Sequence, residues 1–182
     1  MAVLRKDAER TRRAILDAAG ELLQVDQEAS HADIARAAEV GRASVYRHFP
    51  ERSDLVAALL GEMLGRLERI AASHDGVLPL IDLLRATARE QAQCQGLISI
   101  MRREGVAPSQ LEALGVRARA LFADPFAAAQ QEGTVRADLT LDDMLLLLEM
   151  IEGALGPVAD PILRGETAAR ALDLALQGVL VG

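Results

Sequence analysis

The twenty residues Ser30–Phe49 constrain the fold of this chain more than any other stretch. Ser30 and Asp33 have the spacing of a helix capping box, which predicts a short helix directly after Ser30. Residues 39–41 form a tight break, and a second short helix is predicted from about residue 42. Pro50 has no backbone N–H, so that second helix ends before it. Two short helices joined by a three-residue turn are the layout of a helix-turn-helix.

The remainder of the chain also has helical periodicity, with no convincing strand. Ala and Leu dominate, and β-branched and aromatic residues are sparse, which favours helices. Apolar residues recur at helical spacing over about 8–23, 52–71, 78–93, 96–104, 110–131, 140–155 and 166–180. A kink or a new helix is expected at Asp124-Pro125, and Thr140 and Asp143 again have capping-box spacing. The predicted fold is all-α, with about nine helices.

The distribution of charge is uneven. The net charge is -7, which by itself argues against a nucleic-acid partner. Residues 5–13 nevertheless carry five basic and two acidic side chains, and residues 42–52 carry three basic and one acidic. Two small basic patches on an acidic body are compatible with DNA binding, and ordinary solvated helix faces would give the same pattern.

The second short helix has two different faces. Val45 and Phe49 are four residues apart and are predicted to pack inward against the first short helix. The other side chains are then directed outward or sideways: Arg42, Ala43, Ser44, Tyr46, Arg47 and His48. Taken alone, Tyr46 would more often be a half-buried packing residue, and Arg47 and His48 ordinary surface side chains. A tyrosine beside arginine and histidine on one exposed face, however, indicates contact with phosphates and base edges of DNA.

The segment Ser44-Val45-Tyr46-Arg47-His48-Phe49, followed by Pro50-Glu51-Arg52-Ser53-Asp54-Leu55, resembles the signature of the TetR family of transcriptional regulators. The specific resemblance covers about residues 12–64. Further on, Gly133-Thr134-Val135-Arg136-Ala137-Asp138 is similar to a stretch that often precedes the eighth helix in that family. The chain departs from the family at Glu39, where glycine is usual, and at Gly41, where serine or threonine is usual. Glu39 is therefore expected to carry mild strain, and Gly41 to be a weaker N-cap.

The resemblance implies a function and a set of DNA contacts. It implies a helix-turn-helix DNA-binding domain over residues 1–52 and a helical ligand-sensing and dimerisation domain over 53–182. Tyr46 and His48 would hold phosphates with help from Ser44, and Arg42, Ala43 and Arg47 would face bases. Ser30 and Arg52 complete the predicted DNA-binding set, and Lys6 and Arg10 would form an arm along the duplex.

The resemblance also implies a homodimer that binds an inverted-repeat operator and a small apolar effector that releases it, with repression more typical than activation. The dimer interface is predicted on two helical stripes: Leu145, Leu148, Glu149, Ile151, Glu152 and Leu155, and Ala168, Leu172, Ala175, Leu176 and Val179. Either stripe could instead face the core of the chain itself. The candidate effector-binding residues are Gln91, Cys94, Ile98, Met101, Phe122, Phe126, Met144 and Leu147. Apolar residues at this spacing also occur in plain core.

Other function classes find less support in the sequence. An enzyme would need a nucleophile with its base or a set of metal ligands, and none of the three histidines stands in such a pattern. We therefore expect no catalytic site, metal or cofactor. Cys94 cannot form an intramolecular disulfide, and no signal peptide or transmembrane helix is expected, which together fit a cytoplasmic location. A helical interaction module that has lost DNA binding remains an alternative.

Overall fold

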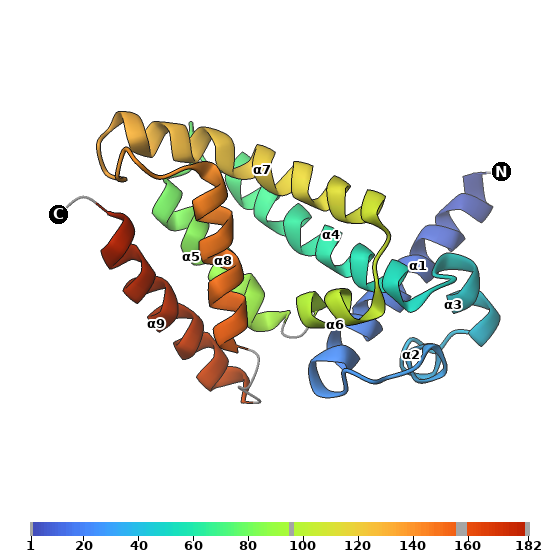
Figure 1. The fold of residues 1–182 in the computed structure, drawn as a ribbon. Coiled ribbons are helices and arrows are strands. Elements are labelled where there is room, and N and C mark those ends of the chain that lie inside the picture. The colour runs from blue at the N-terminus through green and yellow to red at the C-terminus, as the bar shows by residue number, and fades with distance from the viewer. Residues whose placement is uncertain (1, 95–96, 156–159, 181–182) are drawn as a thin grey trace. The chain divides into compact units, whose positions relative to one another are not determined.

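The computed structural model describes residues 2–94, 97–155 and 160–180. These residues form the all-α architecture expected from the sequence (Figure 1). The helices are α1 (Ala2–Val25), α2 (His31–Ala37), α3 (Arg42–His48), α4 (Arg52–Ala72), α5 (Leu80–Gln93), α6 (Leu97–Glu104), α7 (Pro108–Gln131), α8 (Leu141–Leu155) and α9 (Pro161–Val179). None of the described helices combines the length and the hydropathy that a transmembrane span needs.

The chain divides into two compact units. Unit 1 consists of Met1–Gly61 and Gly96–Leu111, and unit 2 consists of Glu62–Gln95 and Glu112–Gly182. Unit 1 therefore holds α1 to α3, the start of α4 and the segment that includes α6. The functional boundary expected near residue 52 stays a prediction, since a structural division does not test it.

Unit 1 has a small apolar core to which α1, α2, α3 and the start of α4 each contribute buried side chains. The helices α1, α2 and α3 contact one another pairwise. Ile15 of α1, Ile34 of α2, Val45 of α3 and Leu55 of α4 are all fully buried. Phe49, which directly follows α3, is buried as well. These side chains fix both short helices, neither of which is long enough to be stable alone.

Unit 2 is built on α5, α8 and α9, which pack against one another (Figure 1). Its core combines leucines of α5 with Phe122 and Phe126 of α7, Met144 of α8 and Leu172 of α9. The helix α7 continues through Pro125, so the new helix start expected at Asp124-Pro125 is wrong, while the kink expected there stays a prediction. Pro125 is buried in this helix, and apolar packing offsets the hydrogen bond that proline cannot donate.

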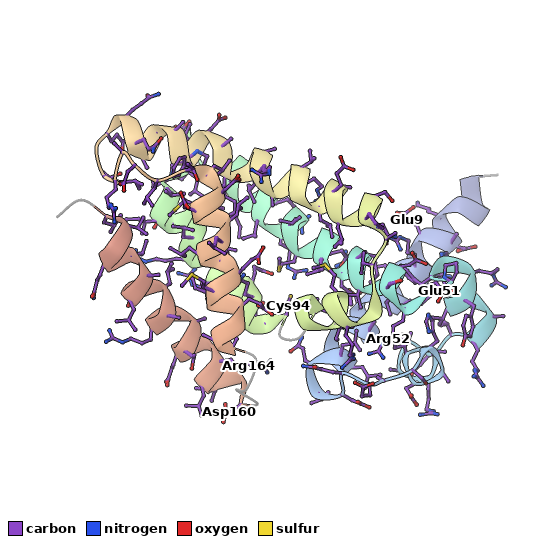
Figure 2. All side chains as sticks on the ribbon, viewed as in Figure 1. Glu9, Glu51, Arg52, Cys94, Asp160 and Arg164 are labelled. Atoms are coloured by element: carbon purple, nitrogen blue, oxygen red, sulfur yellow. The ribbon has the colours of Figure 1, made fainter. Side chains whose placement is uncertain are left out.

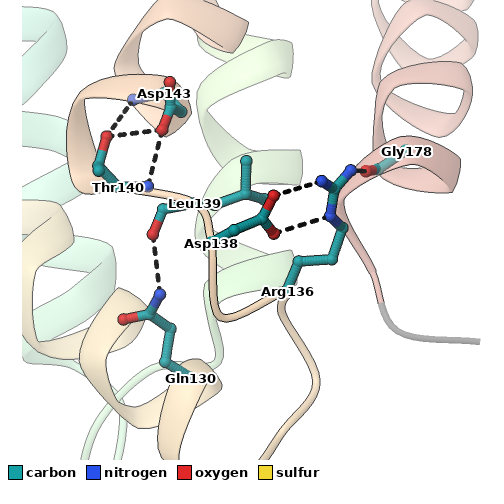
Figure 3. A network of polar contacts seen from close by, with 7 residues as sticks. All are labelled: Gln130, Arg136, Asp138, Leu139, Thr140, Asp143 and Gly178. Atoms are coloured by element: carbon teal, nitrogen blue, oxygen red, sulfur yellow. Dashed lines mark hydrogen bonds and ion pairs between the residues drawn. The ribbon is translucent and has the colours of Figure 1, made fainter.

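The loop between α7 and α8 is tied to the end of α9 (Figure 3). The Arg136 guanidinium donates Nη1 to the carbonyl of Gly178 at 3.0 Å and pairs with both oxygens of Asp138. The backbone N–H of Arg136 donates to the carbonyl of Val179 at 3.1 Å. Carbonyls in the last turn of a helix have no partner within the helix, so Arg136 satisfies two of them. The Gly-Thr-Val-Arg-Ala-Asp stretch thus has a structural role in unit 2.

Candidate nucleic-acid interface

The first helix of the motif begins at the predicted capping box. The Ser30 hydroxyl accepts the backbone N–H of Asp33 at 3.3 Å, and the Asp33 carboxylate accepts the backbone N–H of Ser30 at 3.0 Å. The side-chain hydrogen bond from Ser30 and then the backbone hydrogen bond from Ser30 hold the pKa of Asp33 below its usual value. The capping box is confirmed. The Ser30 hydroxyl also donates a hydrogen bond to Asp33 Oδ2 at 2.6 Å, so in the free protein it is already paired within the capping box.

The turn between the helices has the geometry of a Schellman motif. Val40 donates its N–H to the carbonyl of Ala35 at 3.0 Å, and Glu39 donates to Arg36 at 3.2 Å. Glu39 has a φ of 54°, and it is the one residue other than glycine with positive φ in the described part of the chain. The expected strain at Glu39 is therefore confirmed. Gly41 is the N-cap of α3 and makes no side-chain capping bond, as expected for a weak cap.

Buried and exposed positions divide α3 as the sequence predicts. Val45 and Phe49 are buried. Arg42, Ala43 and Arg47 are exposed, and Tyr46 is 49% exposed. Ser44 and His48 are half-buried at the margin of this face. Two exposed cations and an aromatic hydroxyl therefore lie on one short helix that is anchored from the other side.

Three more of the predicted DNA-binding side chains, besides Ser30, already have protein partners. Arg47 Nη2 donates to the Ser44 hydroxyl at 2.7 Å, so these two residues hold each other in the free protein. Arg52, which begins α4 (Figure 2), is half-buried and donates to the carbonyl of Gln27. This contact gives the Arg52 side chain a structural role, and its contact with DNA stays a prediction.

The sequence reasoning missed two side chains that support this face. His31 stacks on Tyr46, with ring centroids 4.8 Å apart and an interplanar angle of 10°. The Nε2 atom of His31 also lies 3.0 Å from the carbonyl oxygen of Phe49. The Arg12 guanidinium lies over the Phe49 ring, 4.7 Å from its centroid. Helical periodicity assigns residues to faces of one helix, so it gave no signal for these contacts between helices.

The structure brings most of the predicted effector-binding residues into unit 2. Gln91, Phe122, Phe126, Met144 and Leu147 are buried there, and Cys94 is half-buried. Met101 is half-buried but belongs to unit 1, so the structure does not group it with the others. The side chain of Ile98 lies outside those that the structure describes.

Unit 2 also holds buried polar atoms without partners among the described residues. Gln91 Nε2 donates to the carbonyl of Leu148 at 3.0 Å, but Gln91 Oε1 is buried without a hydrogen bond. Arg164, in the first turn of α9 (Figure 2), is 2% exposed, and its Nε and Nη1 atoms lack hydrogen-bond partners. Buried polar groups are usually paired, so each such atom calls for an explanation.

Cys94 has the environment of a packing residue. Burial raises the pKa of its thiol, and Arg66 Nη2 lies 3.4 Å from its sulfur. Arg66 is in turn paired with Glu90 at 2.8 Å. A thiol with a raised pKa is mostly protonated, and only the thiolate is nucleophilic. The environment of Cys94 therefore favours the packing role.

The predicted dimer interface is wrong in most of its residues, because they face the core of the chain itself, and Glu149 alone of them is exposed. Leu148, Ile151, Glu152 and Leu155 of α8, and Ala168, Leu172, Leu176 and Val179 of α9, are buried within the chain. Leu145 and Ala175 are half-buried against the same core. Core and interface stripes have the same helical period, so the sequence could not distinguish them. The exposed apolar side chains of these helices are instead Leu146, Met150, Ile162, Leu163 and Leu174.

Family models match both parts of the chain. Residues 15–59 match the model of bacterial regulatory proteins of the tetR family, and residues 78–181 match the model of the SbtR-like transcriptional regulator C-terminal domain. The second match covers more than half of the chain. The chain belongs to the TetR family. TetR-family proteins are DNA-binding transcriptional regulators and not enzymes.

Relatives of known identity support this assignment. The chain is 59% identical over 51 residues to the HTH-type transcriptional repressor LfrR of Mycolicibacterium smegmatis, a match that spans 28% of the chain and only 27% of LfrR. A TetR transcription regulatory protein from Mycobacterium vanbaalenii has a similar structure, with a TM-score of 0.67 and 26% identity over 98% of this chain and 99% of that chain. LfrR in complex with proflavine has a TM-score of 0.59 and 24% identity, over 91% of this chain and 95% of LfrR. At that identity the likeness shows the fold alone.

Proposed function

We propose that this TetR-family regulator is a repressor that binds an inverted-repeat operator as a homodimer and leaves it when a small effector binds. The proposal rests on the two faces of α3: one face is buried and anchors the helix, and the other is exposed and available to contact DNA. Val45 and Phe49 hold the helix to unit 1, while Arg42, Tyr46 and Arg47 remain accessible. Repression is favoured because LfrR, with its strongly similar segment, is a repressor.

The exposed face of α3 would enter the major groove of DNA. Arg47 and Arg42 would donate to base edges, and a bidentate arginine–guanine contact discriminates by about 1–3 kcal/mol. Binding would require Arg47 to exchange the Ser44 hydroxyl for the base. Tyr46 and His48 would donate to phosphates, and Ser30, Ala43 and Arg52 would lie along the same interface.

The proposed dimer interface combines the exposed apolar faces of α8 and α9. Leu146 and Met150 are one helical turn apart on α8, and Met150 is 66% exposed. Leu163 and Leu174 are exposed on α9, and Thr167 and Ala171 between them are half-buried. Small residues between larger apolar ones allow two helices to approach closely. Two helices from each subunit would then form a four-helix bundle.

The proposed effector site lies in unit 2, around Gln91, Phe122, Phe126 and Met144. These side chains are mostly apolar, but the buried Oε1 atom of Gln91, which has no partner among the described residues, would need a hydrogen-bond donor. An unsatisfied buried polar group costs about 1–3 kcal/mol. We therefore propose an effector that is mainly apolar and carries hydrogen-bonding groups. It would act by binding a form of the dimer that fits DNA poorly.

Selection of genomic fragments by the purified protein, followed by sequencing, tests the DNA-binding proposal. A recurrent inverted repeat is expected. Arg47→Ala should weaken operator binding by about 5- to 150-fold for each subunit bound, whereas Arg85→Ala, an exposed arginine of α5 in unit 2, should not weaken it. No enrichment by folded protein at low salt, before and after refolding without ligand, would show instead a helical module without DNA binding.

Sedimentation and ligand release test the other two parts. Met150→Glu should convert dimer to monomer, because an ionised side chain would be buried in the bundle, whereas Val77→Glu, which places the same charge at an exposed apolar residue outside α8 and α9, should leave the dimer intact. Proflavine, which is bound in the LfrR complex, is a suitable first probe for release of the operator. A small-molecule library then follows, and release that persists in a Phe122→Ala variant would argue against the proposed site.

A further inference from the structure

We propose that His31 is a positioning residue for DNA binding, which holds the Tyr46 ring in the orientation that presents its hydroxyl to the phosphate backbone. The inference rests on the proposed contact between Tyr46 and DNA. His31 is the first residue of α2 and Tyr46 lies in the middle of α3. The two side chains therefore join the two helices of the motif directly.

The contact between the two rings has the geometry of a stacked pair. Their centroids are 4.8 Å apart and their planes differ by 10°, which is within the range in which aromatic pairs stabilise each other. Tyr46 is 49% exposed, so one side of its ring faces solvent. Stacking on the other side restricts the torsions that an exposed tyrosine would otherwise sample.

The imidazole is itself held by the end of α3. Its Nε2 atom lies 3.0 Å from the carbonyl oxygen of Phe49, and a carbonyl oxygen can only accept. Nε2 therefore carries the ring N–H and donates a hydrogen bond to the backbone carbonyl of Phe49. Phe49 is fixed in turn, because its ring is buried and covered by the Arg12 guanidinium. The position of His31 is thus determined by α1 and α3 as well as by α2.

The Tyr46 hydroxyl is available for an external partner. It makes no hydrogen bond to another residue in the described part of the chain, although the ring carrying it is stacked. A fixed donor loses less conformational freedom on binding than a mobile one. Removal of the stack should therefore weaken operator binding by about 2- to 12-fold for each subunit bound.

A double-mutant cycle on operator DNA tests this inference. His31→Ala should weaken binding in the native background and have no further effect in a Tyr46→Ala background, because its action passes through Tyr46. An equal loss in both backgrounds would mean that His31 meets DNA by itself, which overturns the proposal. No loss in the native background overturns it as well. His74→Ala, an exposed loop histidine of unit 2, is the matched control.

Conservative variants separate the ring from its hydrogen bond. His31→Phe keeps a ring for stacking and should stay within about twofold of native affinity, whereas His31→Gln keeps an N–H donor without a ring and should behave like His31→Ala. The reverse order of affinities would overturn the role of the stack. Circular dichroism and urea unfolding must show that each variant is folded.

An optical readout distinguishes this inference from the proposed function. Tyr46 is the one tyrosine of the chain, and the chain has no tryptophan. Tyrosine emission therefore reports on this ring alone. Its intensity and anisotropy should change in His31→Ala and not in His74→Ala, in the absence of DNA. Unchanged emission refutes the stack, whereas unchanged operator binding by Tyr46→Phe refutes the DNA contact and leaves the stack standing.

Discussion

Replacement of Glu39 by glycine should stabilise unit 1. Glu39 follows the C-terminus of α2 with a φ of 54°, in the left-handed region where a Cβ atom crowds the following carbonyl oxygen. Two hydrogen bonds of the Schellman motif fix this conformation, from Val40 to Ala35 and from Glu39 to Arg36. The turn therefore cannot relax without losing them, and the strain persists in the native state.

The expected gain follows from two opposing effects. A residue other than glycine in the left-handed conformation costs about 1–2 kcal/mol. Glycine in its place gives back about 0.4–1 kcal/mol, because it increases the conformational entropy of the unfolded chain. With the middle of each range, about 1.5 and about 0.7 kcal/mol, the net gain in the free energy of unfolding is about 0.8 kcal/mol. For a chain of this size it corresponds to a rise in the melting temperature of about 1–4 °C.

Urea unfolding followed by the emission of Tyr46 measures this gain in the unit that contains the turn. The control is Glu39→Ala, which removes the same charge but keeps a Cβ atom and therefore keeps the strain. We expect only Glu39→Gly to shift the midpoint to higher urea at an unchanged slope. If Glu39→Ala were as stable as Glu39→Gly, the gain would come from the lost charge, and the conformational argument would be refuted.

Three further predictions concern other parts of the molecule. The lowered pKa of Asp33 means that its stabilisation is complete above the ordinary carboxyl pKa and is lost as the pH falls through the folded-state value. Ser30→Ala should therefore flatten the acid side of the pH–stability profile, and an unaltered profile would contradict the prediction. Arg136→Lys should speed hydrogen exchange near Gly178, because one ammonium cannot replace the paired contacts of the guanidinium; exchange at the native rate would count against the tie. Met144→Ala should cost about 2–5 kcal/mol in urea unfolding if the fully buried Met144 is packed core, and a negligible cost would point to an open cavity.

The local features of the helix-turn-helix could be predicted because each depends on residues close in sequence. The capping box needed only Ser30 and Asp33 at the correct spacing. The strain at Glu39 followed from the left-handed conformation that the turn requires. The burial of Val45 and Phe49 followed from their four-residue separation on one helix.

The features that the sequence did not predict depend on packing between distant segments. The stack of His31 on Tyr46 joins residues of two helices, and no periodicity within either helix indicates it. Met101 matched the apolar pattern of the effector set but lies in the other compact unit. Pro125 is a helix breaker by local rules, yet it is buried within α7, where tertiary packing outweighs one missing hydrogen bond.

The residues that anchor α3 are different from those proposed to contact bases, and this has a consequence for the evolution of operator preference. Substitutions at Arg42, Ala43 and Arg47 change exposed side chains, and exposed substitutions usually alter stability by less than about 0.5 kcal/mol. Val45 and Phe49 meanwhile keep the helix in place. Paralogues of this regulator could therefore diverge in the DNA that they recognise without passing through unstable intermediates, and a library randomised at these three exposed positions should consist mostly of folded proteins.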